Sequence, residues 1–168
     1  MSIRTTAIML LISLLIVHTF THAQNNSELS TLNDAIISYI QSQKADWKYE
    51  NVQPITGSAA VVLQQWTLDS QSVRIAIISH KSTQDAATAI SKLAREGQLI
   101  ERVQALGDEG ISWGRGVVSF RNRNLTIDVS AANIDSTRNP TELSNKGMDA
   151  HKIAREFALL VADAIKRK

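Results

Sequence analysis

Three segments of the chain carry apolar residues at intervals of three and four positions, which places those residues on one side of an α-helix. The segments are residues 28–44, 82–97 and 140–167. Their repeated apolar positions are Leu29, Leu32, Ile36 and Ile40, then Ala86, Ile90 and Leu93, then Ala150, Ala154, Phe157 and Val161. The start signals agree, because Ser82 and Asp85 resemble a capping box and Pro140 suits a first helical position. The pattern predicts three amphipathic helices.

Two pairs of segments are rich in β-branched and large apolar residues and are joined by short polar turns. Residues 58–68 and 72–79 flank Asp69-Ser70-Gln71, which predicts an antiparallel hairpin over residues 58–79. The polar residues 121–124 separate the next two segments and predict a second hairpin over residues 111–131. Residues 47–52 predict a short strand or an extended connection. Residues 98–106 fit a continued helix and an extended approach equally well.

The order of these elements predicts an α+β fold. Consecutive hairpins form an antiparallel sheet, and amphipathic helices bury their apolar sides against such a sheet. We expect a two-layer sandwich built from the two hairpins, with all three helices packed on one face.

The first 23 residues have the pattern of a secretory signal peptide. Arg4 precedes the apolar residues 7–17, and Thr21 and Ala23 occupy the small-residue positions of a cleavage site. The competing interpretation is an uncleaved membrane anchor, but a spanning helix needs about 20 apolar residues. We expect cleavage near Ala23, which would leave residues 24–168 as a single soluble α+β domain in the periplasm or the medium, with no membrane span.

Composition excludes several classes of protein. The 168 residues are 43% hydrophobic and 20% charged and include no cysteine. There is therefore no disulfide, no thiolate metal site, no cysteine nucleophile and no lipid-attachment residue. Residues 1–23 contain Arg4 and no acid, so removing them from 18 basic and 16 acidic residues leaves 17 against 16. This near balance of basic and acidic residues does not favour nucleic acid as a partner, which would require a concentrated basic surface.

Few residues of the sequence are candidates for catalysis or metal binding. Beyond the signal segment the histidines are His80 and His151, and no HExxH-like pair accompanies them. A catalytic zinc site needs three protein ligands. We therefore predict no metal site and no cofactor, and no serine lies in a Gly-x-Ser-x-Gly elbow that would indicate a hydrolase.

The most distinctive short motif is Gly107-Asp108-Glu109-Gly110. Asp108 and Glu109 are weak candidates for a general acid and base, with His80 as a third catalytic candidate. The alternative is a glycine-framed turn whose carboxylates cap backbone amides or pair with arginines. We favour the turn.

Three arginines surround the second hairpin and are candidate ligand-binding residues: Arg115, Arg121 and Arg123. Strand alternation would place Arg121 and Arg123 on the same side if the strand continues through both. A small anion or an acidic partner could bind there, and solvated turn arginines are the alternative.

Four aromatic residues fit either a sugar-stacking platform or core anchors, and we favour core anchors: Trp47, Tyr49, Trp66 and Trp113.

The Gly107–Gly110 motif is part of a longer recurring pattern. The pattern consists of Leu106, Gly107, Asp108 and Glu109, then Val118, Phe120, Arg121 and Asn124, and then a C-terminal helix. The pattern resembles that of uncharacterised bacterial exported and lipoprotein-type domains. The resemblance implies an α+β fold and export, and it implies no activity. This chain departs from it by lacking a lipid-attachment cysteine.

These observations favour a non-enzymatic binding or accessory protein of the bacterial envelope, with an envelope protein or a small molecule as partner. One alternative is a small hydrolase-like enzyme that uses Asp108 and Glu109. Another is an ion or small-ligand sensor, which would need the acids and arginines of residues 107–124 to converge. A homodimer through an unpaired edge strand is compatible with the sequence.

Overall fold

The computed structural model describes residues 27–53, 60–96, 101–114, 116–133 and 140–168, with residues 140–148 described by their backbone only. Its first element is a helix over residues 27–43, which we call the N-terminal helix. The elements that follow are β1 (Lys48–Val52), β2 (Val61–Leu68), β3 (Gln71–Ser79), α2 (Thr83–Glu96), β4 (Glu101–Arg102), β5 (Glu109–Gly114), β6 (Val117–Asn122), β7 (Leu125–Asn133) and α3 (Pro140–Lys166).

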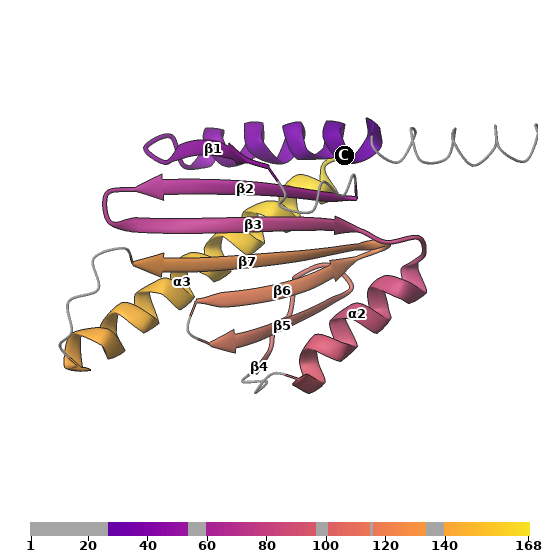
Figure 1. Cartoon of the computed structure of the whole chain (residues 1–168). Coiled ribbons are helices and arrows are strands. Elements are labelled where there is room, and N and C mark those ends of the chain that lie inside the picture. The colour runs from indigo at the N-terminus through magenta and orange to yellow at the C-terminus, as the bar shows by residue number, and fades with distance from the viewer. Residues whose placement is uncertain (1–26, 54–59, 97–100, 115, 134–139) are drawn as a thin grey trace, which may run out of the picture.

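The strands of the described residues form one seven-stranded sheet in the order β1-β2-β3-β7-β6-β5-β4 (Figure 1). Every neighbouring pair is antiparallel. The chain builds two meanders, β1 to β3 and β4 to β7, and α2 connects them. The last strand, β7, pairs with β3 and so joins the two meanders at the centre of the sheet. The predicted α+β class and antiparallel sheet are confirmed.

The N-terminal helix and α3 pack on the same face of the sheet, which we call the covered face. Side chains alternate between the faces of a strand, and the residues pointing to this face join one hydrophobic core with both helices. Its largest fully buried members include Ile36, Ile40, Trp66, Ile75, Ile77, Phe120, Ile127 and Phe157. The Phe157 ring lies 4.8 Å from that of Trp47 and 6.1 Å from that of Trp66, so both tryptophans are core anchors as predicted.

Helix α2 packs on the opposite face. Strand β6 is buried on both sides, because Val118 and Phe120 join the core on the covered face while Ser119, which points the other way, is only 2% exposed. Helix α2 contacts β6 and β7, and its buried Ala86 and Ile90 lie outside the covered-face core. The expectation that all three helices share one face therefore holds for the N-terminal helix and α3 but not for α2.

The ambiguous residues 98–106 are extended where the structure describes them. Glu101 and Arg102 form the short edge strand β4 against β5, and a turn over residues 103–108 follows. Residues 47–52, for which two interpretations stood, contain β1 paired to β2. Gly97, the last residue of the predicted helix 82–97, lies outside the described residues.

Candidate functional site

Asp108 connects the turn before β5 to the β6–β7 hairpin through hydrogen bonds. Its carboxylate Oδ2 accepts hydrogen bonds from Arg121 Nη1 at 2.7 Å and from the backbone N–H of Arg123 at 2.8 Å. Its own backbone N–H donates to the carbonyl oxygen of Arg121 at 2.8 Å. Three bonds to one hairpin make Asp108 a structural tie, which agrees with the predicted turn whose carboxylates pair with arginines.

Glu109 makes a separate contact. Its Oε1 lies 3.2 Å from Nη1 of Arg102 on the neighbouring edge strand β4. Both acids line a surface depression of about 310 Å³ formed by residues 102–110. A general acid and base would have to face a common reacting atom, whereas these carboxylates turn toward different arginines.

His80 lies between β3 and α2 and is held against β7. Its ring Nε2 is 2.9 Å from Oγ1 of Thr126, and its backbone N–H donates to the carbonyl of Asn124 at 2.9 Å. Asn124 returns a bond from Nδ2 to the carbonyl of His80 at 3.1 Å. The structure therefore brings His80 to Thr126 and not to Asp108 or Glu109.

A polar cluster lies on the opposite face where α2 covers the sheet. Its members are two cross-strand pairs, Ser119 with Asp128 and Arg121 with Thr126. Ser119 and Thr126 are each 2% exposed, and the Arg121 side chain is 15% exposed. Sequence reasoning identified Arg121 but missed the other three residues.

Asp128 is the one carboxyl among the four residues of this polar cluster. Burial raises the pKa of Asp128, while a hydrogen bond with Ser119 and the charge of His80 act in the other direction. Its Oδ1 is buried and has no hydrogen-bond partner among the described residues, and the same is true of Nε of Arg121. The cluster thus holds one acceptor and one donor that remain unused within the described part of the chain.

Of the three candidate ligand-binding arginines, the structure describes Arg121 and Arg123. Arg121 is committed to Asp108. Strand β6 ends at Asn122, so Arg123 lies in the turn with a positive φ of 54° and an exposed side chain. The condition for Arg121 and Arg123 to share a side is not met. Arg115 lies outside the described residues.

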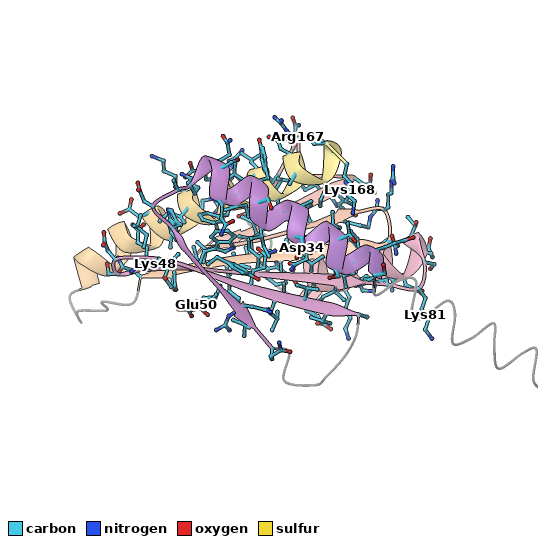
Figure 2. All side chains as sticks on the ribbon, turned by 90° about the horizontal axis from the view of Figure 1, so that it is seen from above. Asp34, Lys48, Glu50, Lys81, Arg167 and Lys168 are labelled. Carbon is cyan, nitrogen blue, oxygen red and sulfur yellow. The ribbon has the colours of Figure 1, made fainter. Side chains whose placement is uncertain are left out.

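The first three strands, β1 to β3, carry a second candidate functional site, a surface that we call the open face. It is the part of the opposite face formed by two cross-strand rows, Glu50–Gln65–Arg74 and Val52–Leu63–Ala76. Helix α2 contacts the central strand β7 and its neighbour β6, and no described helix covers these rows. Viewed from the β1 edge, Glu50 lies on the side of the sheet away from the N-terminal helix and α3 (Figure 2).

Apolar and charged residues occupy separate rows of the open face. Val52, Leu63 and Ala76 are only partly buried and lie outside the hydrophobic core. Glu50 and Arg74 are exposed, and neither forms an ion pair in the part of the chain that the structure describes. The two charges sit on β1 and β3, two strand spacings or about 9.6 Å apart. They do not pair with each other in the described structure.

Among the described residues, no group of three or more histidine, aspartate or glutamate side chains is placed to hold a metal ion. Within the same residues, no helix combines the length and apolar character that crossing a membrane requires.

The fold and these surfaces define a class: an α+β protein whose antiparallel sheet packs against the N-terminal helix and α3 on one face and against α2 on part of the other. Comparisons of the chain with protein-family models, curated protein sequences and solved structures find no match in any of the three.

Proposed function

We propose that this protein is an exported, non-enzymatic binding protein of the bacterial envelope and that the open face is its contact surface. The observation that carries the proposal is the row Val52–Leu63–Ala76, which is apolar, partly exposed and uncovered by any described helix. Apolar side chains gathered on one surface and rimmed by charges are typical of sites that bind other proteins.

Two other observations support it. The apolar segment 7–17, followed by a small-residue cleavage site, favours export. The residues that an enzyme would recruit make structural bonds instead, Asp108 to the β6–β7 hairpin and His80 to Thr126. A binding role requires neither of these groups to be free.

Export is tested by expressing the full chain in a bacterium and measuring the mass of the product in the periplasmic fraction. We expect a chain that begins at Gln24. An intact chain retained in the membrane fraction would contradict export and favour an anchor.

The contact surface is tested with a photo-reactive benzophenone amino acid placed at Gln65, in the middle of the open face. Ser38, exposed on the N-terminal helix over the covered face, is the matched control position. On irradiation of living cells we expect discrete adducts from position 65 and none from position 38. Absence of adducts at 65, or equal labelling at both positions, would remove the open face as a contact surface.

A small-ligand site at the polar cluster is a second candidate, favoured by the unused Oδ1 of Asp128 and Nε of Arg121. Thermal unfolding with metals, nucleotides, sugars and peptidoglycan fragments tests it, because a ligand at about 100 times its Kd stabilises a fold by about 2.7 kcal/mol. A shift that disappears in Asp128→Asn would support this site. If no compound raises the Tm, the cluster is structural.

A further inference from the structure

We propose that the occupant of the open face is a second copy of this chain, bound face to face about a two-fold axis that runs parallel to β2. This inference rests on the proposed function, because it names the partner of the same surface. Closed two-fold dimers are the commonest soluble homo-oligomers, and their contact patch must be complementary to itself.

The charged row meets that requirement. In Glu50–Gln65–Arg74, the neutral Gln65 lies on β2 between an acid on β1 and a base on β3. A two-fold axis along β2 lays β1 of one copy over β3 of the other. Each Glu50 then faces Arg74 of the second copy, which gives two symmetric ion pairs to charges that have no partner in the described chain.

The apolar row fits the same axis. Leu63 on β2 faces its own equivalent, and Val52 on β1 faces the smaller Ala76 on β3. Pairing a larger side chain with a smaller one lets two sheets approach to their usual spacing of about 10 Å. An axis perpendicular to the strands would instead reverse the order of the rows and lay charged positions over apolar ones.

The next row adds no repulsion. Lys48 pairs with Thr67, and Thr67 pairs with Ser72, so the axis along β2 places each Lys48 over Ser72 of the second copy. No like charges face each other in the three rows. The five residues of β1 limit the contact of the three strands to about 17 Å by about 15 Å. This is smaller than the roughly 800 Å² per partner of a standard interface, so we expect a weak, concentration-dependent dimer.

A charge exchange tests the arrangement. The processed chain is measured by sedimentation equilibrium from about 1 µM to 1 mM, a range that includes the Kd of a small interface. Glu50→Arg and Arg74→Glu should each weaken the dimer about tenfold, because each replaces two attractions by two repulsions. The double variant should return the Kd to within about threefold of the original value.

Matched controls use exposed charges elsewhere. Asp34→Arg on the N-terminal helix and Lys81→Glu before α2 make the same charge changes away from the open face (Figure 2). Both should leave the Kd unchanged. Circular dichroism of each variant shows whether a lost dimer reflects a lost fold, and the double variant guards against that explanation.

The chain has no cysteine, so Gln65→Cys creates a single thiol whose equivalent lies across the axis. Sheets about 10 Å apart are beyond the reach of a disulfide, but a short bismaleimide spans that gap. We expect covalent dimers from Cys at position 65 and none from the Ser38→Cys control.

Several results would overturn the inference. A chain that stays monomeric to about 1 mM would do so, as would a dimer that is unaffected by Arg74→Glu, which indicates edge pairing of β1 instead. Failure of the double variant to restore a folded dimer also counts against it. If the photo-reactive group at Gln65 captures a different protein while the chain remains monomeric, the proposed function stands and this inference fails. If position 65 gives no adduct, the proposed function fails with it.

Discussion

At the scale of single residues, Asp128 carries a titratable carboxyl on a strand that lies at the centre of the sheet. Its pKa is raised by burial, so the folded state binds its proton more tightly than the unfolded chain does. In the pH interval between the ordinary pKa of an aspartate and the raised folded value, the folded state holds more protons. This group therefore makes the free energy of unfolding decrease as the pH rises through that interval.

We predict that Asp128→Asn removes this decrease. The amide keeps an oxygen that accepts a hydrogen bond and cannot ionise, so the variant should be more stable than the original at pH 7 by about 1 kcal/mol. Near pH 3 the two should differ little. Urea unfolding between pH 3 and 8 measures the effect, with Asp34→Asn on an exposed helix position as the control. A variant that is less stable at pH 7 would show that the carboxylate is bound in its charged form.

Gly107 illustrates a backbone requirement. Its φ is 56°, and a Cβ at this position would overlap the carbonyl oxygen of Arg121, which accepts the Asp108 backbone bond. We predict that Gly107→Ala lowers the free energy of unfolding by about 2 kcal/mol or more, from strain and loss of the Asp108 contacts. Ala105, also at positive φ (69°), gives a control of opposite sign. Ala105→Gly should be neutral or mildly stabilising in the same chemical unfolding measurement.

At the scale of elements, a polar relay fixes the N-terminal helix on the sheet. Gln64 on β2 is fully buried, and its Nε2 donates to Oδ1 of Asn33 at 2.7 Å. Its Oε1 accepts from Nε1 of Trp66 at 3.0 Å. A buried amide with both ends bonded sets the position of the helix more precisely than apolar packing alone.

We predict that Asn33→Ala leaves the Gln64 amide without its acceptor and lowers the free energy of unfolding by about 1–3 kcal/mol. Ser38→Ala, an exposed position on the same helix, should change it by less than about 0.5 kcal/mol. Urea denaturation compares the two. An Asn33→Ala variant as stable as the Ser38→Ala control would show that the relay does not hold the helix.

The elements whose order and pattern are local could be predicted from the sequence. The β2–β3 hairpin follows from apolar strands around a short polar turn, and Asp69 does adopt the turn conformation with φ 50°. The side of the sheet chosen by α2 could not be predicted. The apolar stripe of α2 indicates which side of the helix is buried. The face of the sheet that α2 covers depends instead on how the chain crosses from β3 to β4.

The candidate site divides in the same way. The tie between Asp108 and the arginines could be predicted because a glycine-framed acidic turn close to basic residues has few other uses. Asp128 was missed because Thr126, Asp128 and Ser130 alternate with apolar residues and have the pattern of a solvent-facing strand side. Only the placement of α2 buries that side. The one available signal was an acid in the middle of a long apolar strand.

At the scale of the whole molecule, the proposed dimer joins two exposed ion pairs to an apolar row. Salt screens exposed charges, with a Debye length of about 10 Å at 0.1 M, but hardly weakens apolar contacts. We predict that the Kd rises severalfold between about 0.05 M and 0.5 M NaCl, and that Glu50→Gln with Arg74→Gln removes most of this dependence. Sedimentation at several salt concentrations measures both. A neutralised pair that keeps the full salt dependence would place the important charges elsewhere.

The position of β7 determines when the fold can close. This strand is the last of the sheet in sequence, yet it pairs with β3 over nine residues, from Gln71 with Asn133 to Ser79 with Leu125. A chain that emerges N-terminus first, from a ribosome or a translocon, therefore exposes the unpaired edge of β3 until β7 has followed. Contacts between segments so distant in sequence form slowly, because the intervening loop must be closed first. The protein thus depends on its final third to complete folding. Truncation or stalling before β7 would leave an incomplete, aggregation-prone sheet.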